Sequence, residues 1–216
     1  MATAHFSPFL EDARFNQLFW RIAGRWAGGP LDVRWRVWVL TQCARQCKNL
    51  SGDLVEFGVY RGASASMILS YIGLRDGQRL HLFDTFSGIP ATELTEAEVA
   101  AGFSGHLADT SIIDLKEFLA PWRDQISFVA GDVLQTTTAA ETGPLSLAHV
   151  DLNAARATKV ALDYVYLRLV SGGMIVFDDY GWAGYEDQRA VIDDFFSSRP
   201  EAILALPTGQ AIVVRL

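Results

Sequence analysis

The sequence predicts an α/β fold: a doubly wound, mostly parallel sheet with a reversed last strand, preceded by an N-terminal helical extension. Short apolar strand patterns alternate with helix patterns from residue 53 onward, which is typical of a parallel sheet covered by helices on both faces. Two closing strand patterns, 202–206 and 211–215, flank the segment Pro207-Thr208-Gly209-Gln210, which favours a hairpin-type connection. The hairpin supplies the reversed strand.

The elements of the core follow one another in a regular order. Strand patterns are short apolar runs, and most helix patterns begin or end at a turn that contains glycine. The predicted strands cover residues 54–59, 80–84, 126–130, 146–151 and 174–177, the last of them entered through Ser171-Gly172-Gly173. The predicted helices cover residues 63–73, 96–101, 112–122, 157–169 and 186–198.

Two further helix patterns, at residues 9–27 and 33–48, precede the core, and Gly28-Gly29-Pro30 separates them. The first is rich in aromatic residues, which give it more large apolar surface than a short segment buries on a sheet already flanked by helices. We therefore expect a homodimer built partly on these helices, with closure over a ligand pocket as the alternative. The aromatic residues concerned are Phe9, Phe15, Phe19, Trp20 and Trp26.

Length and composition agree with one folded domain. The chain has 216 residues, of which 50% are hydrophobic and 20% are charged, so intrinsic disorder is excluded. We expect residues 1–49 to form N-terminal helices and residues 50–216 to form the α/β core of a single domain. The 18 Lys and Arg residues against 25 Asp and Glu residues give a net charge of −7, which argues against binding to nucleic acid.

Hydropathy and cysteine content predict a cytoplasmic protein. The sequence contains no apolar run long enough to span a membrane, and residues 1–10 do not combine a basic start with an apolar stretch. Cys43 and Cys47 lie four residues apart in a helix pattern, a spacing that rarely allows a disulfide, and two ligands make no zinc site. We expect two buried, reduced thiols and no membrane partner.

Polar residues gather where the predicted strands end. In an open α/β sheet, ligands bind outside the carboxyl ends of the strands, so side chains at these ends share one edge. Packing alone does not require a carboxylate in or after every parallel strand. A binding site shared by the strand ends would explain them. The carboxylates are Glu56 in the first strand, Asp84 in the second, Asp132 after the third, Asp151 after the fourth, and Asp178 and Asp179 after the fifth.

The first strand and its turn indicate the class of ligand. Gly58 and Gly62 let a ligand approach the backbone and direct a helix N-terminus at it, but their spacing is not Gly-x-Gly-x-x-Gly. Glu56 would repel a pyrophosphate and attract a cation, and Asp84 is placed to accept hydrogen bonds from ribose hydroxyls. A cationic nucleoside without phosphate is S-adenosylmethionine. This reading favours a methyltransferase over a NAD-dependent dehydrogenase, which stays as an alternative.

Four segments resemble the macrocin O-methyltransferase (TylF/MycF-type) family, and the similarity runs from about residue 50 to the end of the chain. The segments are Val55-Glu56-Phe57-Gly58-Val59-Tyr60-Arg61-Gly62, Leu82-Phe83-Asp84-Thr85-Phe86-Ser87-Gly88-Ile89-Pro90, Phe177-Asp178-Asp179-Tyr180-Gly181 and Pro207-Thr208-Gly209-Gln210-Ala211. The resemblance implies a Rossmann-like class I methyltransferase that uses S-adenosylmethionine and Mg²⁺ to methylate a hydroxyl of a sugar or glycosylated natural product. It assigns to the cofactor Glu56, Gly58, Tyr60, Arg61, Ser64, Asp84, Thr85 and Asp132, with Asp84 at the ribose and Asp132 near the adenine.

Three aspartates form the candidate metal site. Asp151, Asp178 and Asp179 follow adjacent strands, and carboxylates this close need a counter-charge such as Mg²⁺. The alternative is that Asp178 and Asp179 cap the next segment. An ion there would lower the pKa of a substrate hydroxyl and favour its attack on the sulfonium methyl group. Asp151 is the first candidate for the base; His149 and His106 are the others.

One segment departs from the family pattern His-x-Asp-x-Asp-x-Tyr-x-Ser-Thr. Here the second Asp is Asn153, the Tyr is Ala155 and the Ser is Ala157, whereas His149, Asp151 and Thr158 remain. We expect the lost groups to border the substrate, so that the changes alter the acceptor. The alternative is a non-catalytic, S-adenosylmethionine-binding scaffold protein.

Overall fold

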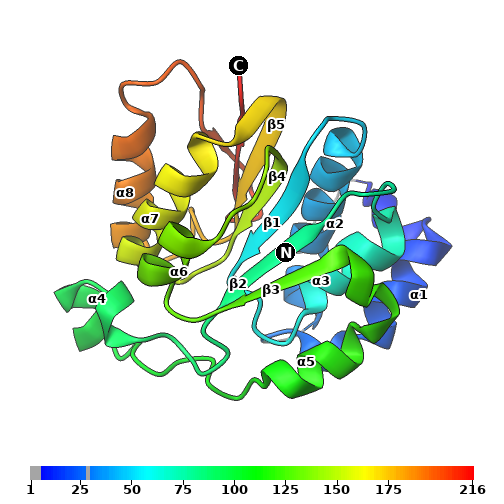
Figure 1. Ribbon diagram of the computed structural model, residues 1–216, viewed down its shortest axis with the longest axis horizontal. Helices are drawn as coiled ribbons and strands as arrows, with labels where there is room; N and C mark the ends of the chain where they lie inside the picture. The colour runs from blue at the N-terminus through cyan, green and yellow to red at the C-terminus, as the bar shows by residue number, and fades with distance from the viewer. Residues whose placement is uncertain (1–5, 28–29) are drawn as a thin grey trace.

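A computed structural model describes residues 6–27 and 30–216 and contains one seven-stranded sheet in the order β3-β2-β1-β4-β5-β7-β6 (Figure 1). Five strands are parallel, and β7 runs antiparallel to both β5 and β6. The predicted doubly wound sheet with a reversed last strand is confirmed. The strands are β1 (Asp53–Phe57), β2 (Leu80–Asp84), β3 (Ile126–Ala130), β4 (Leu145–Val150), β5 (Leu169–Phe177), β6 (Leu204–Ala205) and β7 (Ala211–Val214).

Helices cover both faces of this sheet, as its apolar strands require. Figure 1 shows α1, α2, α3 and α5 on one side and α6, α7 and α8 on the other. Within the described ranges, no helix is both long enough and apolar enough to cross a bilayer. The α-helices are α1 (Ala13–Arg21), α2 (Pro30–Cys47), α3 (Ala63–Met67), α4 (Glu96–Ala100), α5 (Ile112–Phe118), α6 (Val133–Ala139), α7 (Ala155–Tyr166) and α8 (Glu186–Phe196). Short 3-10 turns and one π-helical turn, η3 (Ile68–Ile72), join them.

The core lies in layers on either side of the sheet because side chains alternate along each strand. Val55 and Phe57 of β1 pack with the α7 and α8 side, whereas Leu54 packs with α2 and α3. Glu56 follows the same alternation and faces α2. Its partner in the register of β4 is His149, so two polar side chains lie next to each other on the α2 face near the carboxyl ends of the strands.

Several boundaries differ from the predicted ones. Helix α6 has no counterpart in the prediction, because its threonines 136–138 have low helix propensity, while the Asp132 side chain caps it at the backbone N–H of Leu134 and Val133 is buried. Helix α7 begins two residues before its predicted start and ends three residues before its predicted end. Leu167 and Arg168 form a turn, and Leu169 opens β5, where it pairs with Leu145.

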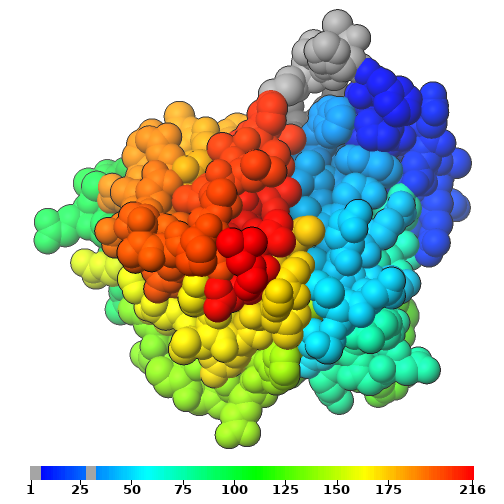
Figure 2. Space-filling model, turned by 90° about the horizontal axis from the view of Figure 1, so that it is seen from above, coloured from blue at the N-terminus to red at the C-terminus, as the bar shows by residue number. Residues whose placement is uncertain are grey.

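The N-terminal segment forms an additional layer rather than a bare apolar surface. Phe9, Phe15 and Phe19 are fully buried against α2 and α3, in a cluster that includes Met67 and Tyr71. Figure 2 shows this dark-blue segment beside the light-blue α2, on the side of the molecule away from the orange α8. The premise that these aromatic residues exceed what the chain buries by itself is therefore wrong for the three phenylalanines, whereas Trp20 stays exposed. The predicted helix end at Gly28 and Gly29 lies outside the described residues.

Candidate active site

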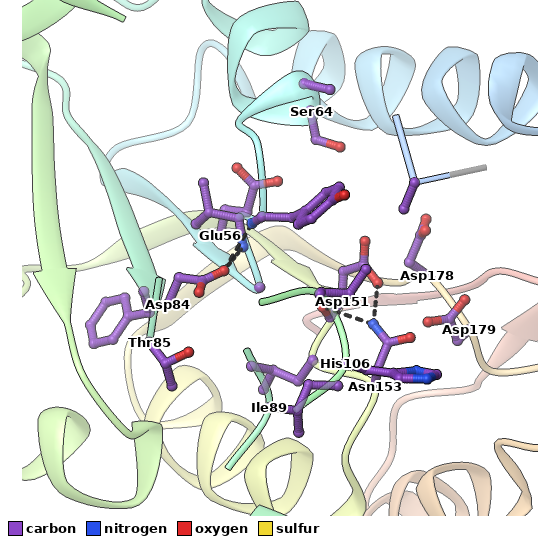
Figure 3. A pocket seen from close by; sticks show the side chains of 18 of the residues that line it. Glu56, Ser64, Asp84, Thr85, Ile89, His106, Asp151, Asn153, Asp178 and Asp179 are labelled. Atoms are coloured by element: carbon purple, nitrogen blue, oxygen red, sulfur yellow. Dashed lines mark hydrogen bonds between the residues drawn. The ribbon is translucent and has the colours of Figure 1, made fainter. Parts of the chain in front are cut away.

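A cavity of about 270 Å³ opens at the carboxyl ends of the parallel strands, where the sequence places its carboxylates (Figure 3). Asp151, Asn153, Asp178 and Asp179 gather at one end of the view, and Asp84 and Thr85 lie at the other. Glu56 lies between them. Ser64, from the start of α3, also lines the cavity. The predicted common site at one sheet edge is thus present.

The turn after β1 brings backbone close to this cavity. Gly58 has φ +84°, and a Cβ atom there would lie 1.8 Å from the backbone oxygen of Asp151. Only glycine accepts both the conformation and the close approach of β1 to the end of β4. Tyr60 also has positive φ, at +50°. Gly62 then takes the left-handed conformation that begins α3. The missing side chain thus serves packing, against the end of β4 at Gly58 and against the Leu115 side chain at Gly62.

Glu56 and His149 form a buried polar pair. Oε1 of Glu56 lies 3.1 Å from Nδ1 of His149, within hydrogen-bond distance. Oε2 of Glu56 and Nε2 of His149 are buried and have no hydrogen-bond partner among the described residues. Burial raises the pKa of Glu56, and the contact with His149 opposes that rise. Because an unpartnered buried oxygen is costly, Oε2 is suited to a donor supplied by a ligand.

Asp84 joins the turn after β1 to the turn after β2. Its Oδ2 accepts hydrogen bonds from the backbone N–H groups of Val59, at 2.6 Å, and Tyr60, at 2.8 Å. Its Oδ1 accepts from the N–H of Phe86 at 2.7 Å. Thr85, the next residue, donates its hydroxyl to the carbonyl of Gly88 at 2.7 Å. Each carboxylate oxygen has more than one lone pair, so Asp84 orders both turns and keeps capacity to accept from a ligand.

The aspartates that follow β4 and β5 form a compact cluster. One ligand atom each from His149, Asp151 and Asp178 lies within 4.8 Å of the others, a spacing that suits a metal ion. Amide groups orient two of the carboxylates: Asn153 donates to Oδ1 of Asp151 at 3.1 Å, and Gln210 donates to Oδ1 of Asp178 at 2.7 Å. The alternative, that Asp178 and Asp179 cap the next segment, finds no support among the described residues, because their side chains contact Gln210 and Arg36 and α8 begins only at Glu186.

Arg36 of α2 supplies a positive charge to this cluster. Its Nη2 donates to Oδ1 of Asp179 at 2.8 Å and also contacts Oδ2 of Asp178. Burial and the neighbouring Asp151 raise the pKa of Asp179 to about 6, and Arg36 opposes that rise. The guanidinium lies 5.3 Å from the ring centre of Trp182. The chain thus contains its own counter-charge for the carboxylates, a role the sequence analysis gave to a metal ion alone.

Comparison with known protein families identifies the family to which the chain belongs. Residues 33–201 match the family described as Macrocin-O-methyltransferase (TylF). The chain belongs to this family. The matched range contains every carboxylate of the cavity, from Glu56 to Asp179, so the resemblance seen in the sequence motifs is confirmed.

Relatives and solved structures agree with membership of the TylF family. A curated protein of Streptomyces olivaceus, 8-demethyl-8-(2,3-dimethoxy-alpha-L-rhamnosyl)-tetracenomycin-C 4'-O-methyltransferase, is 28% identical over 141 residues, which are 61% of this chain and 54% of that protein. The chain therefore spans about half the length of this relative. The O-methyltransferase NovP aligns with TM-score 0.74 at 21% identity, over 83% of this chain and 79% of NovP. The calicheamicin methyltransferase CalS11 aligns with TM-score 0.71 at 19% identity, over 98% and 94% of the two chains. These likenesses show a methyltransferase fold.

The structure places most of the predicted site residues of this TylF family member around the cavity, with three exceptions. Glu56, Gly58, Tyr60, Ser64, Asp84 and Thr85 line the cavity, as do His106, Asp151, Asp178 and Asp179. Arg61 and Asp132 are not among the described residues that line it. Arg61 instead pairs with Asp109, and Asp132 caps α6 and accepts the hydroxyl of Thr92 at 2.8 Å. His149 lies behind the lining, with Nε2 3.6 Å from Oδ1 of Asp178.

The departures from the TylF family pattern do not all face the cavity. Asn153 lines it, but Ala155 and Ala157 are fully buried at the start of α7. The expectation that all three positions border the substrate was therefore wrong for the two alanines. The backbone N–H of Ala155 donates to Oε1 of Glu98 at 2.9 Å, so this side of α7 packs against the segment that contains α4.

Three residues of the site were missed in the sequence. Arg36 lies in a helix pattern far from the motifs, Glu93 follows the β2 motif by several residues, and Gln210 stands inside a quoted segment without an assigned role. Arg36 and Glu93 line the cavity, and Gln210 is buried against Asp178. No local signal marks Glu93, because its burial follows from the packing of its loop against Val133 of α6.

Proposed function

We propose that this chain is an S-adenosylmethionine-dependent, Mg²⁺-assisted O-methyltransferase that acts on a hydroxyl group of a sugar or glycosylated small molecule in natural-product biosynthesis. The observation that carries the proposal is the buried, unpartnered Oε2 of Glu56, which lies beside the glycine turn of a TylF-family cavity. The curated relative supports the acceptor class, since its name describes methylation of a rhamnosyl group. Family membership also favours methyl transfer over the hydride transfer of a dehydrogenase.

The residues at the strand ends suit the proposed cofactor. Glu56 offers a buried acceptor for the ammonium group of the methionine part, and Asp84 offers carboxylate oxygens to ribose hydroxyls. Tyr60, Ser64 and Thr85 line the space around them. When bound, S-adenosylmethionine supplies an electrophilic methyl group next to a positive sulfur. The protein's contribution is to orient this group toward the acceptor and to exclude water.

The aspartate cluster fits a divalent cation in its donor chemistry. Mg²⁺ binds oxygen ligands, and Asp151, Asp178 and Asp179 provide carboxylate oxygens. Hydrogen bonds already orient two of these carboxylates, from Asn153 to Asp151 and from Gln210 to Asp178. A bound cation would stabilise negative charge on an acceptor hydroxyl as it loses its proton. We propose that Asp151 accepts that proton. His149, held by Glu56, and His106, at the cavity rim, are the alternative acceptors.

Cofactor binding tests the first part of the proposal. Calorimetric titration with S-adenosylhomocysteine is expected to show binding, and Asp84→Ala is expected to weaken it at least about tenfold, because hydrogen bonds to a charged group are lost and two turns lose their shared anchor. Asp76→Ala, at an exposed aspartate ahead of β2, is the control and should bind as the wild type does. Binding of NADH without binding of S-adenosylhomocysteine would contradict the proposal.

Methyl transfer itself requires an acceptor screen. Incubation with a labelled methyl donor, Mg²⁺ and a panel of glycosylated metabolites is expected to label at least one acceptor, and EDTA is expected to abolish the labelling. Cofactor binding without labelling of any acceptor would favour the alternative, a binding or scaffold protein of the same fold. Labelling that persists in EDTA would remove the metal from the mechanism.

We also propose that the chain acts as one domain in a cytoplasmic homodimer. The free thiols of Cys43 and Cys47, both buried, support a reducing compartment. Exposed Trp20 at the N-terminal layer supports a contact between copies there. Light scattering without ligand is expected to give a mass near twice 23.8 kDa across dilution. A monomer at micromolar concentration would contradict the homodimer.

A further inference from the structure

Glu93 is a buried carboxyl group that lines the cavity and takes no part in the steps above. It ends the short 3-10 turn η4 (Ala91–Glu93), and only 3% of the residue is exposed. Its Oε1 accepts a hydrogen bond from the backbone N–H of Val133, the first residue of α6, at 3.1 Å. This contact joins the loop after β2 to the helix after β3. Glu93 therefore lies at the β2–β3 end of the cavity.

The order of the strands indicates which part of the cofactor reaches that end. In the order β3-β2-β1-β4-β5, Asp84 of β2 lies between Glu56 of β1 on one side and Val133, just after β3, on the other. The placement of the cofactor rests on the proposed function, in which Glu56 binds the methionine part and Asp84 binds the ribose. The ribose stands between the methionine and the adenine in the cofactor, so the adenine extends toward β3.

The lining of that end suits an adenine base. Val133, the first residue of α6 after β3, lines the cavity at this end and offers an apolar contact for a face of the ring. The edges of adenine are polar and carry acceptor nitrogens, which need a donor once they are removed from water. Asp132, to which the family resemblance gives the adenine, has its two oxygens engaged by Leu134 and Thr92. We propose that the carboxyl group of Glu93 contacts the adenine and donates a hydrogen bond to one of its ring nitrogens.

The surroundings of Glu93 favour the protonated form of this carboxyl group. Burial raises the pKa of Glu93 to about 8, and the hydrogen bond from Val133 opposes the rise. Asp132 adds to it through its charge and through a side-chain hydrogen bond to Glu93, and the charge of Asp84 adds further. The cations that line the cavity are engaged elsewhere, Arg25 with Asp114 and Arg36 with the aspartate cluster. A neutral carboxyl group donates through one oxygen while the other still accepts from Val133.

Titration with S-adenosylhomocysteine between pH 6.5 and pH 9.5 tests the proposal, with Glu93→Gln and Glu93→Leu beside the wild type. The wild-type affinity is expected to fall as pH rises through about 8, by up to about tenfold per pH unit, because the donor proton is lost. Glu93→Gln keeps an N–H donor that does not titrate, so it should bind like the wild type at pH 7 and lose this fall. Glu93→Leu should bind about tenfold more weakly at pH 7, the loss expected for one hydrogen bond.

Two comparisons separate this effect from others. The amino group of the ligand itself also titrates at alkaline pH and affects all variants alike. The informative quantity is therefore the difference between the pH profiles of the wild type and Glu93→Gln. Glu96→Gln, at an exposed carboxylate on the same segment, should keep the wild-type profile. The proposal is overturned if Glu93→Gln retains the wild-type pH dependence, or if Glu93→Leu binds at pH 7 as tightly as the wild type. A wild type that binds no S-adenosylhomocysteine at any pH would instead overturn the proposed function, and this proposal with it.

Discussion

Asp151→Asn is expected to lower the rate of methyl transfer at least about 100-fold, the usual effect of losing a general base. Asparagine cannot accept the proton and offers no negative charge to a cation. The fold should persist, because the amide oxygen of the new residue still accepts from Asn153 in place of Oδ1. Initial rates of transfer from a labelled donor measure the effect, and calorimetry should show unchanged affinity for S-adenosylhomocysteine.

The control for this substitution is Asp163→Asn, at an exposed aspartate on α7 that pairs with Lys159 and lies away from the cavity. Its rate should equal that of the wild type. If Asp151→Asn keeps more than about a tenth of the wild-type rate, Asp151 is not the base. The rates of His149→Gln and His106→Gln would then show which of the two histidines accepts the proton.

Arg36→Met is expected to strengthen binding of a divalent cation by about tenfold or more, since a full positive charge leaves a partly buried carboxylate cluster. Arg36 donates to Asp179 and contacts Asp178, so its guanidinium uses oxygen atoms that a cation would bind. Titration with Mn²⁺, followed by the spin-resonance signal of the free ion, measures this affinity without cofactor or acceptor. At pH 8 the Asp179 carboxyl is ionised in the wild type, because its pKa is about 6.

Arg34→Met is the matched control for Arg36→Met. Arg34 lies on the same helix, but its guanidinium packs over Phe9 and Trp20 instead of the aspartates. Its loss should leave Mn²⁺ affinity nearly unchanged. Weaker Mn²⁺ binding by Arg36→Met would mean that Arg36 holds the carboxylates in place for the ion and does not compete with it.

The strand-end carboxylates could be predicted from the sequence for a simple geometric reason. Parallel strands that alternate with helices present their carboxyl ends at one edge, so Glu56, Asp84, Asp151 and Asp178 had to lie near one another once the strands were recognised. The register of β1 with β4 then sets Glu56 beside His149. The period of a strand decides the direction of each side chain and is readable locally, whereas the register that pairs Glu56 with His149 comes from the structure.

Other features depended on contacts that no local pattern encodes. Helix α6 contains residues with low helix propensity, and the Asp132 cap and burial of Val133 stabilise it. The sequence pattern of the aromatic residues in the first helix is compatible with packing on α3 and with packing on a second chain. In the structure, Phe15 and Phe19 are buried within the chain. The hydrophobic effect is non-directional, so an apolar side chain tends to be buried, but its sequence does not specify which surface it packs against.

The sequence by itself determined the fold class, the family and the carboxylates that surround the cavity, because these follow from periodicity and from short continuous motifs. Only the tertiary structure decided how the charges are compensated. Arg36 meets Asp178 across 142 positions of sequence, and Glu93 becomes buried when its loop closes on Val133 of α6. Charge pairing and burial depend on distances through space, and those distances exist only once the helices have packed on the sheet.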